Sequence, residues 1–312
     1  MDYDRYGDGT ERMEFGYVFF NLIIKIFGDY TIFLLLTNAF IVSSWAVLAK
    51  KLFPEWPIIT FAFIVVCNLV FPVRLQLATC VCQWSLYFLY EKKYILYTIT
   101  CITATLIHKS SIMVAPLFLL LPIRIKTPVA YGILFVTLIA DIFNEQIVGA
   151  ILFLASLFDS IYPDLANNLT TYSDCELSGA TEMTFTQKII SFGFSLFLLC
   201  MLIDARNYTE TKHGDLGVCH DKRKINIFIN CFIAFTFCYK FFSNEYLANF
   251  RRVSEFFTIG YAMAVIFALH TERKTYRLIT VYILFILLFL YKLKGLLDTP
   301  YPELFYPYKS IL

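Results

Sequence analysis

Three short stretches of the chain place charged or titratable side chains inside or beside long apolar segments. Arg74 lies in FPVRLQLATC, between two apolar runs that leave no room for a solvated loop. His108 and Lys109 lie in ATLIHKSSIM, where one apolar run ends and the next begins at once. Arg251 and Arg252 form a basic pair in SNEYLANFRRVSEFF. A charge in apolar surroundings is costly unless it is paired, so each of these residues is a candidate for function.

The chemistry that these side chains favour is a reaction at a diphosphate. Guanidinium groups bind phosphate oxygens through two parallel hydrogen bonds. A histidine, whose unperturbed pKa is about 6.5, can accept a proton at neutral pH and act as a general base toward a hydroxyl. Arg74 and the basic pair, on one face with His108, would therefore suit a diphosphate leaving group and a hydroxyl nucleophile.

Each candidate also has a structural interpretation. Arg74 would then be a helix-end side chain that extends to lipid phosphates. His108 would hydrogen-bond a helix end, with the two serines that follow it as ordinary helix caps. The basic pair at 251–252 would form ion pairs with Glu245 and Glu255.

Signals for metal or nucleotide binding are weak. His213, Cys219 and His220 share a polar stretch, but a fourth ligand at a recognised zinc spacing is missing. The chain has no Walker loop, no GxGxxG and no Asp-x-Asp signature. We therefore expect no metal and no cofactor.

The composition indicates the kind of protein that holds these residues. Of 312 residues, 59% are hydrophobic and 16% are charged, whereas a soluble domain is about 45–50% apolar and about 25% charged. A formal charge of +2 gives no nucleic-acid footprint. These values predict an all-α, polytopic integral membrane helix bundle.

The apolar runs predict about ten membrane crossings, since a spanning helix needs about 20 mostly apolar residues. A further run at 147–160 reads as a half-helix or interfacial element, and residues 1–312 are expected to form a single transmembrane domain. The predicted crossings lie at about 31–49, 57–73, 75–90, 94–108, 111–123, 128–144, 187–203, 225–242, 253–269 and 277–294.

The distribution of basic residues predicts which side each connection faces, because Lys and Arg in short loops mark the cytoplasmic side. Most of the basic residues between the two chain ends fall on alternate connections, and six are exceptions. The stretch 161–186, which has four acidic residues and no basic one, is then an external loop. The chain would begin outside, so we expect it to lack a preceding transmembrane helix. The basic residues assigned to the inside are Lys50, Lys51, Lys92, Lys93, Arg124, Lys126, Arg206, Lys212, Lys222, Arg223, Lys224, Arg273, Lys274 and Arg277.

The order of several short motifs along the chain carries a resemblance. They run from the acidic start DYDRY through MEFGYVFFN, FGDYTIF, FPVRLQLA, EKKY, LIHKSS and NFRRVSEFF to the closing YPYK. This order resembles the EpsG family of exopolysaccharide proteins, which belongs with the Wzy-type polymerases of O-antigen and capsule. Each motif is short, so the resemblance depends on their order rather than on any one of them.

The resemblance implies a multi-pass glycosyltransferase of the bacterial cytoplasmic membrane, with a GT-C-like helix bundle and a site that faces the periplasm or exterior. Such an enzyme moves a growing glycan from undecaprenyl diphosphate onto another lipid-linked repeat unit. It would need no metal or nucleotide. Its expected partners are this lipid-linked oligosaccharide, membrane lipid and a chain-length regulator, but no nucleic acid.

The family's charged positions carry over to particular residues of this chain. His108 is the first choice of general base, and Glu14 in MEFGY is its rival. Tyr162 and Tyr172 of the external loop could stack on sugar rings. The residues expected to bind the diphosphate are Arg74, Lys109, Arg251 and Arg252.

Two other functions fit the same residues. A lipid-linked oligosaccharide ligase, or another multi-span glycosyltransferase, would use similar groups but a different acceptor. A non-catalytic transporter or flippase of lipid-linked sugars should show two related halves with broken helices. No such repeat is visible in the sequence.

Overall fold

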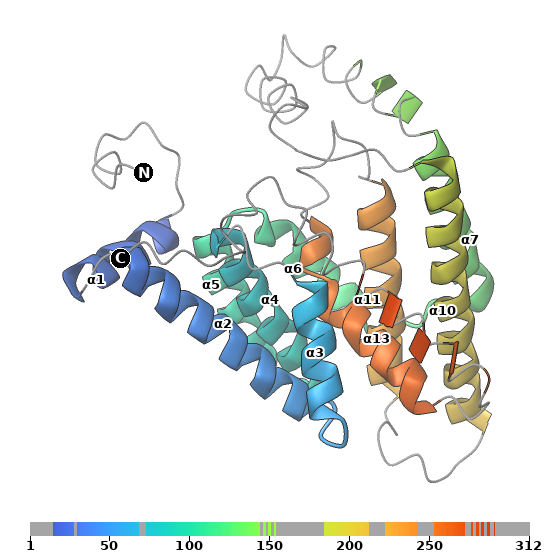
Figure 1. Cartoon of the computed structure of the whole chain (residues 1–312), viewed down its shortest axis with the longest axis horizontal. Coiled ribbons are helices and arrows are strands. Elements are labelled where there is room, and N and C mark those ends of the chain that lie inside the picture. Colours follow the sequence, from blue (N-terminus) through green and yellow to red (C-terminus); the bar gives the residue numbers. More distant parts are fainter. Residues whose placement is uncertain are drawn as a thin grey trace. The chain divides into compact units, whose positions relative to one another are not determined.

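The computed structural model describes residues 15–27, 30–68, 73–143, 184–211, 222–241 and 253–271, with isolated residues and pairs at 146–153 and 276–290. In this part of the chain every regular element is helical and no strand occurs (Figure 1). The all-α prediction is thus confirmed for the described residues.

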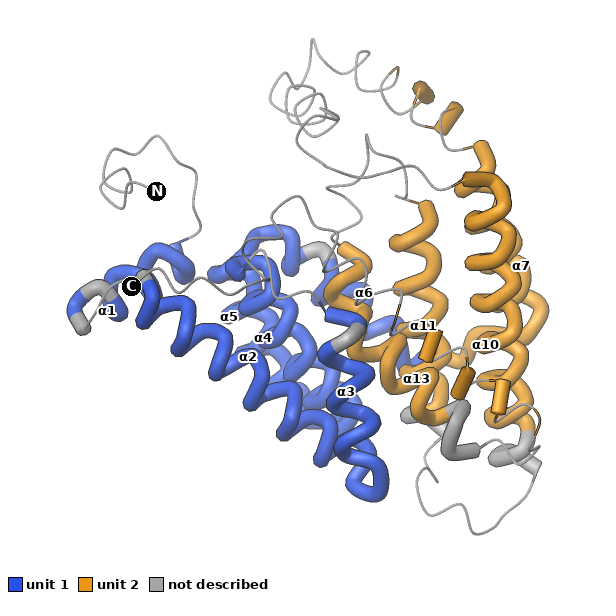
Figure 2. Tube along the Cα trace, viewed as in Figure 1, with its two compact units in different colours: residues 1–123 blue, residues 124–312 orange. Residues whose placement is uncertain are grey.

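The chain divides into two compact units, residues 1–123 and residues 124–312 (Figure 2). Unit 1 contains α1 (Phe15–Phe27), α2 (Tyr30–Leu52), α3 (Pro57–Cys67), α4 (Val73–Tyr90), α5 (Tyr94–Ile107) and α6 (Ser111–Leu120). Unit 2 contains α7 (Thr127–Ile142), α10 (Phe185–Thr211), α11 (Lys222–Phe241) and α13 (Thr258–Thr271).

Most of the predicted apolar runs coincide with helices. Two described helices are long and apolar enough to cross a bilayer by length and composition, over Thr31–Leu52 and Phe185–Asn207, and five shorter apolar helices accompany them. The figure of about ten crossings and the GT-C-like fold stay predictions. The runs at 147–160 and 277–294 lie mostly outside the described residues.

Three helix bounds differ from the sequence analysis. The run at 57–73 was expected to be one crossing, but α3 ends at Cys67. It ends there because Asn68 is extended, with φ −105° and ψ 136°, and its side-chain amide donates to the Ile64 carbonyl at 2.6 Å. Helix α1 was not predicted, since its 13 residues are too few for a crossing. Helix α10 continues to Thr211, through residues expected in a polar connection.

A buried chain of polar side chains ties three helices of unit 1 together. The indole N–H of Trp45 on α2 donates to Oε1 of Gln83 on α4 at 2.7 Å. Nε2 of Gln83 donates to Oδ1 of Asn68 at 3.0 Å, and Asn68 closes α3 as described above. Polar groups away from water need such partners, and side-chain amides that bond across helices give an apolar bundle a defined register.

In unit 2, α11 and α13 approach closely because a glycine faces a small side chain. A Cβ atom added to Gly260 on α13 would collide with the side chain of Cys231 on α11. Small residues at such points let helix backbones approach and gain van der Waals contact. Cys231 is fully buried there.

Arg206 corrects one assignment of the sequence analysis. It was counted with the basic residues of an inner connection, but it lies within α10 and is only 2% exposed. Its guanidinium donates to the Ile125 carbonyl and to Oγ1 of Thr127, each at 2.9 Å. The buried arginine therefore fixes the start of α7 against α10.

Replacing Arg206 by alanine should destabilise the protein, because the Ile125 carbonyl and the Thr127 hydroxyl would lose their donors. We expect the free energy of unfolding to fall by about 1–3 kcal/mol. The measurement is thermal unfolding of the purified protein in detergent. Gly193→Ala on the same helix is the control, since nothing lies within 4 Å of the added Cβ. A melting temperature equal to that of the wild type would show that these hydrogen bonds contribute nothing.

Candidate functional site

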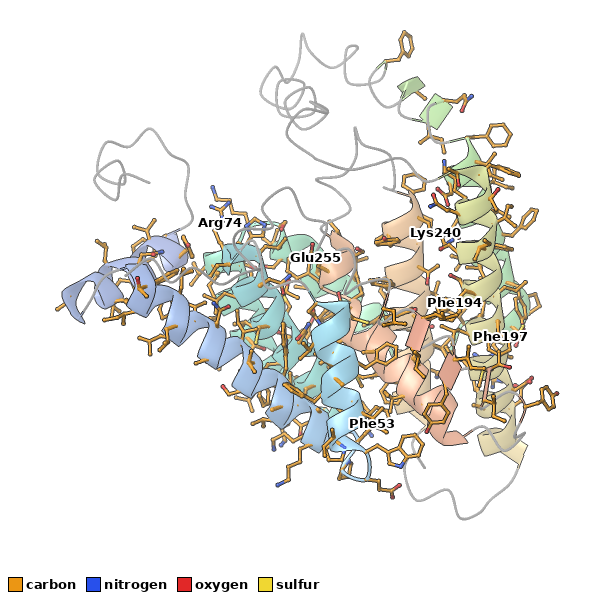
Figure 3. All side chains as sticks on the ribbon, viewed as in Figure 1. Phe53, Arg74, Phe194, Phe197, Lys240 and Glu255 are labelled. Carbon is orange, nitrogen blue, oxygen red and sulfur yellow. The ribbon has the colours of Figure 1, made fainter. Side chains whose placement is uncertain are left out.

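Arg74 is held at the beginning of α4 by the ring of an α1 residue. Its guanidinium carbon lies 5.9 Å from the centroid of the Tyr17 ring, within cation–π range. Tyr17 is buried, and its ring meets that of Phe33 on α2 edge to face at 5.9 Å between centroids. Figure 3 labels Arg74 at this end of unit 1. The tyrosine thus positions the arginine while its own ring is packed from another side.

The first turn of α1 also lies against the last turn of α5. A Cβ atom added to Gly16 would be 2.7 Å from the Leu106 carbonyl oxygen and 2.8 Å from its carbonyl carbon. Only a residue without a side chain permits this approach. Tyr17 follows Gly16 and His108 comes two residues after Leu106, so the segments that carry Arg74 and His108 both lie near the first turn of α1, at the same end of unit 1.

The backbone around His108 is fixed by hydrogen bonds. His108 ends α5 in an extended conformation, with φ −152° and ψ 114°, and its N–H donates to the Ala104 carbonyl at 2.8 Å. Its carbonyl accepts from the backbone N–H and the hydroxyl of Ser111, at 3.1 and 2.8 Å. The imidazole is half-buried, whereas Lys109 is exposed. These hydrogen bonds therefore fix the backbone of His108, and the Ser111 hydroxyl bonds its carbonyl rather than its ring.

The expectation that both serines are ordinary helix caps is wrong. Ser110 occupies the N-cap position of α6 but makes no side-chain capping hydrogen bond. Ser111 is the first residue of α6, and its hydroxyl donates to the preceding turn instead. The two hydroxyls thus leave the amides at the start of α6 without a side-chain cap.

The structure tests only part of the predicted site. Arg74, His108 and Lys109 are described and belong to one unit, whereas the other predicted site residues lie outside the described residues. The predicted roles of all these residues remain predictions. Within the described ranges, no group of three or more His, Cys, Asp or Glu side chains could hold a metal ion. The undescribed members are Glu14, Tyr162, Tyr172, Arg251 and Arg252.

Sequence reasoning missed two features of the site region. Gly16 and Tyr17 lie in the quoted segment MEFGYVFFN, but no rule of spacing connects them with Leu106 or Arg74. The second feature is a set of charged side chains in unit 2, namely Asp141 on α7, Lys188 on α10 and Lys240 on α11, of which Figure 3 labels Lys240. Its two lysines were among the six basic residues that break the sidedness rule, which was the available signal.

Replacing Gly16 by alanine should loosen α1, because the new methyl group would collide with the Leu106 carbonyl. We expect a loss of about 1–3 kcal/mol in stability, as for other overpacked contacts, and faster hydrogen exchange of the α1 amides. Gly132→Ala is the matched control, since nothing lies within 4 Å of its added Cβ. If the α1 amides of Gly16→Ala exchanged at the wild-type rate, the close approach would not be what holds α1.

Comparison with known proteins adds one finding to this geometry. The model of the EpsG family matches residues 1–310, which is nearly the whole chain. Comparisons with curated proteins and with solved structures gave no match. A family match of this length, with motifs in the expected order and apolar helices throughout the described part, establishes membership. The chain is a helical membrane protein that belongs to the EpsG family.

Proposed function

We propose that this protein polymerises undecaprenyl-diphosphate-linked repeat units into exopolysaccharide, capsule or O-antigen at the outer face of the bacterial cytoplasmic membrane. Membership of the EpsG family supports a polymerase-type role. The observation that carries the proposal is that Arg74 and His108 lie at the same end of unit 1, on segments that the first turn of α1 contacts. A cation and a titratable imidazole at one helix-bundle end are what a diphosphate leaving group and a hydroxyl nucleophile require.

Arg74 and Lys109 would stabilise the charge that gathers on the departing diphosphate. A cation that is already oriented costs no reorganisation as the bond breaks, and removing one comparable donor lowers the rate by about 10²–10³. The Tyr17 ring supplies that orientation for Arg74. The resemblance adds Arg251 and Arg252 to this group, and Tyr162 and Tyr172 as sugar-stacking residues.

His108 would remove the proton from the acceptor hydroxyl as it attacks the donor sugar. General-base catalysis contributes about 10²–10⁴ to the rate. Hydrogen bonds with Ala104 and Ser111 fix the backbone of His108, so the imidazole would extend toward the substrate from a defined position. Glu14 is the rival base, and it directly precedes the first residue of α1 in the sequence.

Deleting the gene should stop polymerisation without stopping the supply of substrate. We expect single repeat units on lipid but no long chains, measured by gel electrophoresis of the extracted glycans. Wild-type protein should restore the long chains, and Arg74→Ala should not, although it still inserts into the membrane. Lys93→Ala, at an exposed inner turn, removes the same charge and should restore them. Unchanged chain lengths in the deletion strain would exclude the polymerase. If the deletion strain still makes long chains on lipid but does not transfer them to another acceptor, the protein is a ligase.

The base can be assigned by two neutral variants. His108→Gln should lower the polymerisation rate by about 10²–10⁴ if the imidazole takes the proton, whereas Glu14→Gln should leave most activity. The measurement is the rate of chain growth in membranes with equal amounts of each variant. The opposite result, with His108→Gln active and Glu14→Gln inactive, would move the base to Glu14.

A further inference from the structure

Three charged side chains from three helices come together in unit 2. Asp141 lies at the end of α7, Lys188 near the beginning of α10, and Lys240 is the next-to-last residue of α11. All three helices belong to the same compact unit, and α7 packs against both of the others. None of these residues has a part in the reaction described above.

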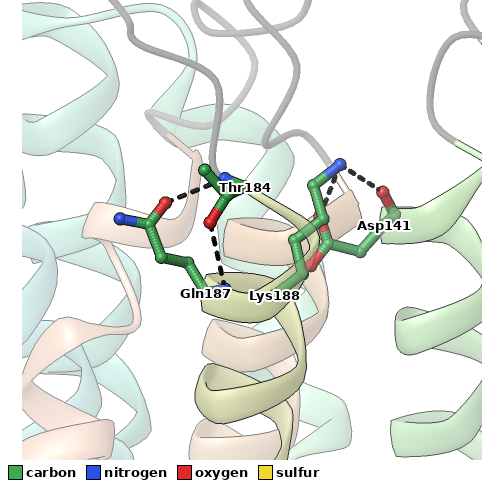
Figure 4. Close-up of polar contacts among 4 residues, drawn as sticks. All are labelled: Asp141, Thr184, Gln187 and Lys188. Atoms are coloured by element: carbon green, nitrogen blue, oxygen red, sulfur yellow. Dashed lines mark hydrogen bonds and ion pairs between the residues drawn. The ribbon is translucent and has the colours of Figure 1, made fainter.

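The beginning of α10 is built to hold Lys188 in place (Figure 4). The Thr184 N–H donates to Oε1 of Gln187 at 2.8 Å, and the Gln187 N–H donates to Oγ1 of Thr184 at 3.3 Å. This reciprocal pair is a capping box. From the next residue, Nζ of Lys188 donates to the Asp141 carbonyl at 2.8 Å and lies 3.8 Å from its carboxylate.

Lys240 is more deeply buried and less well satisfied. It is 4% exposed, and within the described residues its ammonium makes no hydrogen bond. The carboxylate of Asp141 acts on it electrostatically, but the same carboxylate also faces Lys188. The C-terminal dipole of α11 favours a cation in the last turn, although it amounts to only about half an elementary charge. The trio therefore holds two cations against one carboxylate.

A buried ammonium that donates no hydrogen bond is unfavourable unless an anion completes its surroundings. At the start of α10 the capping box already uses the amides of Thr184 and Gln187. The available donors are the ammonium groups of Lys188 and Lys240. Both are point charges with three donors each, which suits the oxygens of a phosphate.

The level of the trio in the membrane narrows the choice of anion. The basic residues assigned to the inside lie before α7, in the first turn of α11 and after α10, so the predicted sidedness puts the trio at the outer ends of all three helices. Near the end of a spanning helix, the phosphates of lipid headgroups are the anions present at high density. A lipid-borne phosphate is therefore the chemistry that this trio fits.

We propose that Lys188 and Lys240, held by Asp141, form a second anion site that binds the diphosphate of the acceptor lipid. This inference rests on the proposed polymerase function, in which both substrates carry a diphosphate. The base must act beside the donor diphosphate, because the attacked sugar carbon bears it, so the end of unit 1 with His108 and Arg74 serves the donor. The acceptor reacts through its distant non-reducing sugar, so its diphosphate needs cations that take no part in bond breaking.

The test uses the full-length protein in detergent, with farnesyl diphosphate as a soluble probe and farnesol as the probe without phosphate. Wild-type protein should bind farnesyl diphosphate in two events by isothermal titration, and farnesol in neither. Lys240→Met should weaken one event about tenfold or more, the loss expected when a charge-assisted contact is removed. Lys188→Met should do the same. Its ammonium is partly exposed, so this variant serves if Lys240→Met fails to fold.

Two controls make the result specific. Lys240→Arg keeps the charge and should keep both events. Lys126→Met removes one charge at the exposed beginning of α7, the opposite end of that helix from Asp141, and should leave both events unchanged. Two unaltered events in both Lys240→Met and Lys188→Met would overturn the site.

Further experiments distinguish a membrane lipid from the acceptor diphosphate as the source of the phosphate. They also distinguish failure of the anion site from failure of the proposed polymerase function. If phosphatidylglycerol displaces farnesyl diphosphate from the second event in vesicles, the site takes membrane lipid and the acceptor assignment is overturned. If the deletion strain makes chains of normal length while Lys240→Met still loses binding, the polymerase fails and the anion site stands. If chains are lost on deletion but Lys240→Met binds and polymerises like wild type, the second site fails alone.

Discussion

The structure depends on one constraint: a polar group in an apolar bundle must find its partner within the protein. In unit 1 this constraint is satisfied by a series of hydrogen bonds, in which Trp45 donates to Gln83, Gln83 to Asn68 and Asn68 to a backbone carbonyl. In unit 2 it is satisfied by Arg206, whose guanidinium donates hydrogen bonds to Ile125 and Thr127 at the start of α7. These contacts run between helices, so the satisfaction of polar groups also fixes helix register. A charge that remains incompletely satisfied under such a constraint is informative, and Lys240 is the clearest case among the described residues.

Close backbone approach is the second means by which the helices are positioned. Gly16 allows α1 to lie against the Leu106 carbonyl, and Gly260 allows α13 to lie against Cys231. In the first case the consequence reaches the site, since the neighbouring Tyr17 ring lies beneath the Arg74 guanidinium. A short helix that could not cross a bilayer by itself thus contacts both Arg74 and the end of the helix that His108 follows.

Helix positions followed from the sequence because hydrophobicity and charge act locally. The run at 94–108 corresponds to α5, and the lysines at 50–51 close α2 as the sidedness rule suggests. Contacts between distant segments did not follow. Asp141, Lys188 and Lys240 are separated by about fifty residues each, and no periodicity connects them. Arg206 shows the same limit, because composition cannot distinguish a solvated arginine from a buried one that hydrogen-bonds the start of another helix.

The predicted direction of each helix assigns four charged residues to the same side of the membrane. The basic residues assigned to the inside close α2, precede α5 and α7 and begin α11, so the predicted sidedness makes α4 and α10 run inward and α5 and α11 run outward. Arg74 lies in the first turn of α4 and Lys109 follows α5, while Lys188 lies in the first turn of α10 and Lys240 in the last turn of α11. The predicted sidedness therefore assigns these four described basic residues to the outer side, where the insertion rule disfavours basic residues. An anion on that side would account for them, and the proposed reaction between two diphosphate-bearing lipids would supply two such anions.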